Sequence, residues 1–319
     1  MIFTQANERH SCPSETELIH LIKIWLGAVN PAYPNGIGDD CAIVKTPQSQ
    51  QLLTTDSLTY GKHFDHSISP EAAGEKLVKR NISDIAAMGG TPQYALLNLM
   101  CAPNISIRWL EDFFKGIRQC CEKYEIQLVG GDISGLDENQ FSASITLTGI
   151  CVKPKLRQTA QVGDKIFVTG SLGGSLLGKH STFDPRLTEG KWLAQRSEVT
   201  AMMDLTDGLA KDLNAMLPPG TSASINLENV PLSLAAHKTA TESGRPALAH
   251  AFQDGEDYEL LFTVKPMQSD FVDVWTATFP ELPIHQIGKI IPAVPNGVYV
   301  DASTLEALPW THGYEHLIP

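Results

Sequence analysis

The sequence predicts an α+β protein of two domains. Its 319 residues are about twice the usual length of a single domain. Helical and extended segments alternate in both halves of the chain, and no repeat of fixed period connects them. Between the halves, residues 153–164 (KPKLRQTAQVGD) form a polar and basic stretch. We therefore expect one domain at residues 1–152 and a second at residues 153–319.

The first half contains helices with clear start and stop signals. A capping box, SETE at residues 14–17, precedes apolar residues at helical spacing. A second helix begins at the Ser-Pro pair of residues 69–70, where proline suits the first turn, and it ends at the glycine pair of residues 89–90. A third helix is expected at residues 106–124, and strands at residues 51–55, 94–101, 126–129 and 141–152.

The second half repeats this mixture in a different order. It opens with an expected strand at residues 165–169 and a glycine-rich turn. Further strands are expected at residues 200–203, 223–227 and 258–264, helices at residues 207–217, 232–243 and 266–279, and two short strands after these.

The charge and the cysteines limit the classes of function. Asp and Glu number 36 against 24 Lys and Arg, which gives a net charge of -12 and argues against a nucleic-acid partner. Six cysteines without a C-x-x-C pair suit a reducing compartment better than a disulfide framework. No apolar signal region and no stretch of ~20 apolar residues is visible. We therefore expect a cytoplasmic protein that does not associate with membranes.

The placement of aspartates is the main functional signal. Seven stand out: Asp39, Asp40, Asp56, Asp84, Asp132, Asp204 and Asp207. Five of them flank expected strands, where loops converge on one rim of a sheet. A turn or helix-cap role explains any one of them, but a set of carboxylates repels itself unless cations are present. Few Lys or Arg residues stand beside them in the sequence. Mg²⁺, which prefers oxygen ligands and phosphates, is the expected partner.

Six motifs carry a resemblance to a known family. They are GIGDDCAIV, TTDSLTYGKHF, NISDIAAMGGTP, LVGGDIS, MDLTDGLAKDL and DGEDYELLFTV. In this order and spacing they resemble the thiamine-monophosphate kinase family, from about residue 14 to Tyr314. The wider superfamily includes aminoimidazole ribonucleotide synthetase and selenophosphate synthetase. The resemblance implies that ATP phosphorylates thiamine monophosphate to thiamine diphosphate by direct in-line transfer, assisted by several Mg²⁺ ions.

The resemblance also implies roles for particular residues. Metal ligands are expected at Asp40, Thr54, Thr55, Asp56, Asp84, Asp132, Asp204 and Asp207. Nucleotide contacts are expected at Gly131, Asp132, Arg157 and Thr206, and contacts to thiamine monophosphate at His63, Glu256 and Tyr314. No covalent nucleophile is expected, because the metal ions held through Asp56, Asp84 and Asp204 assist the transfer.

The implied fold is that of aminoimidazole ribonucleotide synthetase. Its N-terminal domain binds ATP and Mg²⁺ and forms a β-barrel with a second copy, and its C-terminal α+β domain completes the active site. A homodimer is therefore expected. The sequence departs from the family pattern in a shorter stretch between residues 170 and 204, and in Ile133 and Ser134 after the GGD motif.

Two other functions remain open from the sequence. One is a related ATP-dependent enzyme with a different acceptor, and the other is a catalytically silent protein that binds nucleotide or thiamine. A P-loop is disfavoured, although residues 173–179 have the spacing G-x-x-x-x-G-K, because His180 stands where Ser or Thr would bind Mg²⁺. Similarly, His312 and His316 have a zinc-like spacing but lack the accompanying Glu of a metalloprotease motif.

Overall fold

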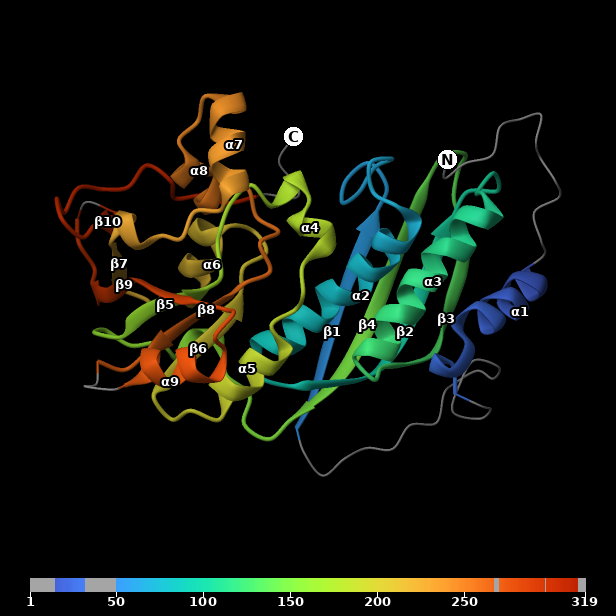
Figure 1. The fold of residues 1–319 in the computed structure, drawn as a ribbon, viewed down its shortest axis with the longest axis horizontal. Coiled ribbons are helices and arrows are strands. Elements are labelled where there is room, and N and C mark those ends of the chain that lie inside the picture. Colours follow the sequence, from blue (N-terminus) through green and yellow to red (C-terminus); the bar gives the residue numbers. More distant parts are fainter. Residues whose placement is uncertain (1–14, 32–49, 267–269, 296, 315–319) are drawn as a thin grey trace. The chain divides into compact units, whose positions relative to one another are not determined.

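The protein is α+β and divides into two compact units. The computed structural model describes residues 15–31, 50–266, 270–295 and 297–314. An N-terminal unit comprises residues 1–85 and 90–152, and a C-terminal unit comprises residues 86–89 and 153–319 (Figure 1). Each unit has its own sheet.

The sheet of the N-terminal unit has four strands in the order β1-β4-β2-β3. Their bounds are Gln50–Thr59 for β1, Thr91–Cys101 for β2, Gln127–Gly135 for β3 and Phe141–Cys151 for β4. Strand β4 runs antiparallel to both β1 and β2, whereas β2 and β3 are parallel. Consequently β1 and β3 are the two edges of this sheet.

Helices cover one face of that sheet. In β4, buried residues alternate with partly exposed ones, because successive side chains point to opposite faces. The helices of this unit are α1 (Glu15–Leu26), the short helix η2 (Gly27–Val29), α2 (Pro70–Ala87) and α3 (Ile107–Lys123). Helices α2 and α3 lie side by side (Figure 1), at a crossing so close that a Cβ on Gly74 would stand 2.0 Å from the carbonyl oxygen of Phe113. Glycine at this crossing therefore lets α2 and α3 pack tightly against each other.

The C-terminal unit has a six-stranded sheet in the order β10-β7-β9-β5-β8-β6. The bounds are β5 Lys165–Thr169, β6 Val199–Asp204, β7 Thr221–Ile225, β8 Leu260–Val264, β9 Ile284–Pro292 and β10 Tyr299–Asp301. The short helices are η3 (Arg157–Thr159), η4 (Ser175–Leu177), α4 (Lys179–Thr182) and η5 (Leu227–Asn229). The longer ones are α5 (Leu187–Ala194), α6 (Leu209–Met216), α7 (Leu234–Ser243), α8 (Ala247–Gln253) and α9 (Phe271–Thr278).

Both faces of this second sheet are buried. In β5, Ile166 and Val168 belong to a core that also contains Leu213 of α6 and Phe252 of α8. The residue between them, Phe167, belongs to a different core on the opposite face, together with residues of α5 and α9. A sheet covered on both faces explains why β5 and β8 read as continuous apolar runs in the sequence.

The structure corrects several of the expected elements. Strand β1 extends to Thr59 and β3 to Gly135, so Asp56 and Asp132 lie inside strands and not at strand ends. Asp56 and Asp132 belong to the sheet of the N-terminal unit and Asp204 to that of the C-terminal unit, so these three do not lie at one rim of a single sheet. Helices α4, α5 and α8 were not expected from the sequence. No described helix combines the length and the apolar character that crossing a membrane requires.

Candidate active site

In the N-terminal unit, β1 and α2 bring together three of the residues that the sequence singles out. The hydroxyl group of Thr54 donates a hydrogen bond to the carboxylate of Asp84 on α2. Two residues along β1, the backbone N–H of Asp56 donates to Oδ1 of Asn81 at 3.1 Å. Arg80 places its guanidinium 3.4 Å from Oδ1 of Asp56. This cluster supplies oxygen donors from Thr54, Asp56 and Asp84, with one cation already beside Asp56.

Thr55 and Asp132 lie on the opposite face of the same sheet. Because neighbouring residues of a strand alternate in direction, Thr55 points away from the helices that Thr54 faces. The hydroxyl of Thr146 donates to Oγ1 of Thr55 at 3.3 Å across the β1–β4 pair. Asp132 is exposed on the far edge strand β3, opposite Asn98 of β2. Three strand spacings, about 14 Å, separate the edges β1 and β3. Within one chain, Asp56 and Asp132 therefore cannot share an ion.

Gly131 has a structural requirement of its own. A Cβ at this position would lie 1.7 Å from the carbonyl oxygen of Leu97 on the paired strand β2. The adjacent Asp132 accepts a hydrogen bond at 3.0 Å from the hydroxyl of Ser134, two residues along the same face. The GGD motif therefore permits the close pairing of β2 and β3 and exposes one carboxylate.

His63 lies in the loop after β1 with one ring nitrogen engaged. Its Nδ1 accepts the backbone N–H of Thr59 at 2.9 Å, so a neutral His63 carries its ring proton on Nε2. The fully buried Lys76 of α2 donates to the carbonyl oxygen of His63 at 2.8 Å. These two contacts fix the backbone and the ring of a predicted substrate contact.

In the C-terminal unit, the turn between β6 and α6 carries Asp204, Thr206 and Asp207. The buried Asp212 of α6 accepts the backbone N–H groups of Thr206 at 2.9 Å and Asp207 at 3.0 Å, both on Oδ2. Gly208 follows with φ 96°, a conformation that suits glycine. Burial, partly offset by these N–H groups, raises the pKa of Asp212 to about 7.

The carbonyl groups of the same turn are bound from the other side. The backbone N–H of Glu256 donates to the carbonyl oxygen of Thr206, and that of Tyr314 to the carbonyl oxygen of Asp207, both at 2.8 Å. The segment that contains Gly255 approaches the turn so closely that only glycine fits there. A Cβ on Gly255 would lie 2.6 Å from the carbonyl oxygen of Thr206. Residues predicted to bind metal and nucleotide are thus joined directly to residues predicted to bind the acceptor.

Two basic residues accompany this turn. Lys211 places its ammonium group 3.0 Å from Oδ2 of Asp207 and 2.9 Å from the carbonyl oxygen of Tyr314. Arg157 is exposed on η3, a short helix that packs against β6 and α6. Asp207, like Asp56 beside Arg80, therefore has a cation next to its carboxylate. The spacing of four residues between Asp207 and Lys211 was a signal for that pair.

Glu256 occupies an unusual backbone position beside a histidine and an aromatic pair. Its φ is 56°, a left-handed conformation that is uncommon for residues other than glycine. His180 of α4 places Nδ1 3.2 Å from Oε2 of Glu256. Nearby in the chain, Tyr258 stacks on Phe183 with ring centroids 3.8 Å apart. The motif DGEDYELL therefore brings a carboxylate and an aromatic stack close to the β6–α6 turn.

The other two carboxylates of this motif are buried and have opposite environments. Asp257 accepts the backbone N–H of Gly173, at 2.9 and 3.1 Å, and burial raises its pKa to about 7. Glu259 accepts two bonds from Arg186 at 2.7 Å and one from Lys179 at 2.8 Å. Burial alone would raise the pKa of Glu259, but these cations outweigh it and lower the pKa. Lys179 is thus a partner of Glu259, in agreement with the rejection of a P-loop.

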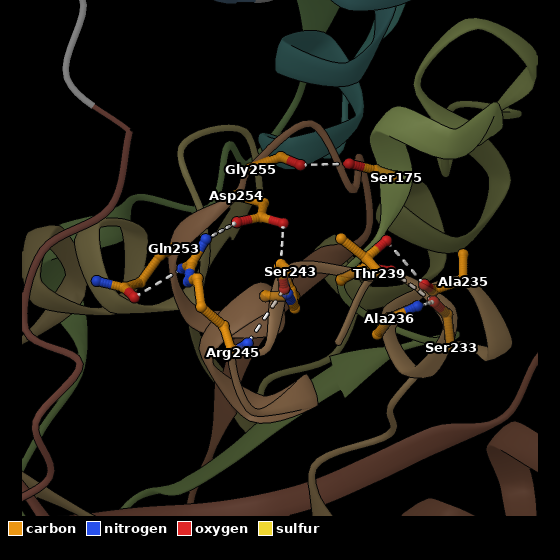
Figure 2. A network of polar contacts seen from close by, with 12 residues as sticks. Ser175, Ser233, Ala235, Ala236, Thr239, Ser243, Arg245, Gln253, Asp254 and Gly255 are labelled. Carbon is orange, nitrogen blue, oxygen red and sulfur yellow. Dashed lines mark hydrogen bonds and ion pairs between the residues drawn. The ribbon is translucent and has the colours of Figure 1, made fainter. Parts of the chain in front are cut away.

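A polar network holds the segment before Glu256 in place (Figure 2). The hydroxyl of Ser175 donates to the carbonyl oxygen of Gly255 at 2.5 Å. Asp254 binds Arg245 at 3.3 Å, and also Nδ1 of the buried His250 at 2.6 Å. These contacts anchor α8 and the residues that follow it, and so they restrict the position of Glu256.

The structure therefore brings some of the predicted site residues together in each unit: Thr54, Asp56 and Asp84 in the N-terminal one, and Asp204, Thr206, Asp207, Glu256 and Tyr314 in the C-terminal one. Thr55, Gly131 and Asp132 lie apart from the first group. Asp40 lies outside the described residues. Within the part of the chain that the structure describes, no three or more His, Cys, Asp or Glu side chains gather closely enough to hold a metal ion. Sequence reasoning missed Asp212, Lys211 and Glu259. Asp212 stands near the start of an expected helix, where acidic residues are favoured, and Lys211 follows Asp207 by four residues. Glu259, in contrast, binds partners at least 73 residues away and gave no local signal.

Comparison with known proteins identifies the class and then the family. A family model described as AIR synthase related protein, N-terminal domain, matches residues 38–151. With the two α+β units, this places the chain in the AIR synthase-related class. The thiamine-monophosphate kinase of Rhodopirellula baltica is 38% identical over 273 residues, which cover 82% of this chain and 84% of that protein. The chain belongs to the thiamine-monophosphate kinase family.

Solved structures agree with this assignment. One solved structure, AaThiL complexed with AMPPCP and TMP, has 31% sequence identity to this chain and a TM-score of 0.70. The match covers 96% of this chain and 99% of that one. Thiamine-monophosphate kinase from Stenotrophomonas maltophilia K279a has a TM-score of 0.73 at 28% identity, covering 92% of this chain and 96% of that one. The predicted α+β fold of the AIR synthase-related class is therefore confirmed over nearly the whole chain.

Proposed function

We propose that this protein transfers the γ-phosphoryl group of ATP to thiamine monophosphate, giving ADP and thiamine diphosphate. Its membership of the thiamine-monophosphate kinase family supports the reaction. The observation that carries the proposal is the β6–α6 turn, where the carbonyl oxygens of Thr206 and Asp207 accept the N–H groups of Glu256 and Tyr314. Residues proposed to bind the nucleotide and metal are thus hydrogen-bonded through the backbone to residues proposed to bind thiamine monophosphate.

Mg²⁺ is the proposed metal, because the candidate ligands are hard oxygen donors. Thr54, Asp56 and Asp84 converge in the N-terminal unit, and Asp204 and Asp207 flank one turn in the C-terminal unit. Further proposed ligands from the family motifs are Asp40, Thr55 and Asp132. Bound Mg²⁺ ions neutralise phosphate charge and position the reacting groups.

The side chains of this protein then have binding and orienting roles. The acceptor oxygen belongs to a phosphate that is already ionised at neutral pH, so no strong general base and no covalent nucleophile is required. Gly131, Asp132, Arg157 and Thr206 are the proposed nucleotide contacts. We assign His63, Glu256 and Tyr314 to thiamine monophosphate, where the carboxylate of Glu256 and the ring of Tyr314 suit a cationic thiazolium.

A homodimer is the proposed functional form, with the N-terminal domain (1–152) binding ATP and Mg²⁺ and providing the interface. The C-terminal domain (153–319) completes the site. The uncovered face of the N-terminal sheet supports this, because Leu53 and Leu96 are 71% and 44% exposed on it.

The proposed compartment is the cytoplasm. Cys120 and Cys121 are neighbours in α3, and burial raises the pKa of both thiols. The four cysteines in the described part of the chain are free thiols, and protonated buried thiols suit a reducing environment.

The test is turnover by the purified protein with ATP, Mg²⁺ and thiamine monophosphate. We expect thiamine diphosphate and ADP in equal amounts, and neither product when Mg²⁺ is removed by EDTA. ADP release with another phosphorylated acceptor, but not with thiamine monophosphate, would indicate the related enzyme with a changed acceptor. Nucleotide binding without turnover of any acceptor would indicate the silent binding protein. Asp204→Asn is the control variant, because it removes one charged ligand while keeping the size of the side chain.

A further inference from the structure

Asp212 lies beside the proposed metal ligands but has no role in the family resemblance. We infer that Asp212 is the positioning residue of the β6–α6 turn, and that it sets the affinity of Asp204 and Asp207 for the divalent cation. This inference rests on the proposed function and specifies how one half of the site is built.

The geometry of the turn carries the inference. A single carboxylate oxygen of Asp212 accepts the N–H groups of two consecutive residues, Thr206 at 2.9 Å and Asp207 at 3.0 Å. Fixing both N–H groups orients the peptide planes on either side of Thr206. The carbonyl groups of Leu205, Thr206 and Asp207 meet the N–H groups of Tyr258, Glu256 and Tyr314, all at 2.8 Å. The turn is therefore bound through its donors by Asp212 and through its acceptors by two other segments.

Burial makes the contribution of Asp212 large. Asp212 is 4% exposed, as is Asp204, and Asp207 is partly buried. An N–H group shielded from water costs about 1–3 kcal/mol when it loses its acceptor, and the N–H groups of two partly buried residues, Thr206 and Asp207, depend on this one oxygen. Without Asp212 the turn would have to reorient toward water, and the directions of the Asp204 and Asp207 side chains would change with it.

The same geometry separates a positioning role from a ligand role. The Oδ2 atom of Asp212 is occupied by two backbone donors, whereas the Asp207 side chain is 23% exposed. Residues that orient metal ligands typically change metal affinity or activity by about 10- to 100-fold when they are removed.

Two substitutions distinguish these roles. Asp212→Asn keeps a carbonyl oxygen that can accept both N–H groups but carries no charge, and Asp212→Ala removes the acceptor. Asp164→Ala is the matched control, because Asp164 is also buried in the C-terminal unit and accepts the backbone N–H of Gln161 at 2.9 Å. Electron paramagnetic resonance measures the binding of Mn²⁺ without substrates. The Mg²⁺ dependence of turnover gives kcat and the apparent KM for Mg²⁺. The temperature of thermal unfolding shows whether each variant is folded.

We expect Asp212→Ala to weaken Mn²⁺ binding at least 10-fold and to raise the apparent KM for Mg²⁺ by a similar factor. Asp212→Asn should stay within about threefold of the unmodified protein, and Asp164→Ala should lower the unfolding temperature without changing Mn²⁺ affinity. Unchanged Mn²⁺ affinity in Asp212→Ala would overturn the inference. So would a loss in Asp212→Asn as large as that in Asp204→Asn, and this result is available even if Asp212→Ala does not fold.

Failure of the proposed function gives a different result. An unmodified protein that binds Mn²⁺ but forms no thiamine diphosphate removes the kinase proposal, while the comparison of Mn²⁺ affinities still decides the role of Asp212. Conversely, normal turnover and normal Mg²⁺ dependence in Asp212→Ala would remove only the role of Asp212.

Discussion

The backbone N–H of Tyr314 donates to the carbonyl oxygen of Asp207 at 2.8 Å, although 107 positions separate the two residues in the chain. Lys211 adds a second link, because its ammonium group contacts both the Asp207 carboxylate and the carbonyl oxygen of Tyr314. A residue expected at the thiamine end of the substrate is therefore tied to a residue expected at a metal ion. Binding at either end should affect the other.

Lys211→Met should tighten binding of divalent cations. The ammonium group competes with a cation for Asp207, and the pair is partly exposed, so its removal is worth about 0.5–1 kcal/mol or two- to fivefold in affinity. Loss of the link to Tyr314 should at the same time raise the KM for thiamine monophosphate. Titration with Mn²⁺ and steady-state kinetics measure the two effects.

The control for Lys211 is Lys238→Met, which removes an exposed lysine whose ammonium group stands 4.0 Å from Glu242. We expect no change in Mn²⁺ affinity or in KM for this variant. Weaker Mn²⁺ binding in Lys211→Met would show that Lys211 orients Asp207 and does not compete for it.

The sequence predicts elements well where local signals determine them. Ser106 begins α3 as an N-cap, accepting the N–H of Trp109, and proline opens α2 as expected. The ends expected for strands β1 and β3 come too early in the chain, because Asp56 and Asp132 look like turn residues. Both lie on edge strands, where a polar side chain meets a cation or solvent without crossing a packed core.

The site was predictable as a set of residues but not as a set of contacts. The family motifs name Asp204, Thr206 and Asp207, and these do lie on one turn. The partners that fix a site come from distant segments, as when Glu259 binds Lys179 and Arg186. Such pairing depends on the topology of the six-stranded sheet, which short-range patterns do not determine.

Asp257→Asn should stabilise the protein increasingly as the pH rises. Burial raises the pKa of Asp257 from its ordinary value to about 7. Between these two values the unfolded chain has released the proton and the native protein retains it, so a higher pH destabilises the native state. Asparagine avoids this cost and keeps an oxygen for the N–H of Gly173. Urea unfolding at pH 6 and pH 8 should show a gain of the variant over the unmodified protein that is larger at pH 8, by on the order of 1 kcal/mol. A gain independent of pH would contradict a raised pKa.

Glu259→Gln should have the opposite effect. Its carboxylate is 1% exposed and binds both Arg186 and Lys179, so removing the charge leaves two partly buried cations without this counter-ion. Breaking such a buried pair costs about 3–5 kcal/mol. The lowered pKa of Glu259 means that its stabilisation is lost only as the pH falls below the ordinary range of a glutamate. The loss in urea unfolding should therefore be the same at pH 6 and pH 8, unlike the effect at Asp257, and a loss that varies between them would contradict the assignment.

Gly131→Ala should separate a structural role of the GGD motif from a nucleotide contact. The new Cβ would stand 1.7 Å from the carbonyl oxygen of Leu97, so β2 and β3 must move apart and the free energy of unfolding should fall by several kcal/mol. The neighbouring Gly130→Ala is the control, because its Cβ would meet only a methyl group of Leu96 at 3.3 Å, which a rotation of that side chain relieves. Urea unfolding and ATP binding are measured on both. We expect Gly130→Ala to retain stability and ATP affinity, and Gly131→Ala to lose stability. A stable Gly131→Ala that has lost only ATP affinity would instead make Gly131 primarily a nucleotide contact.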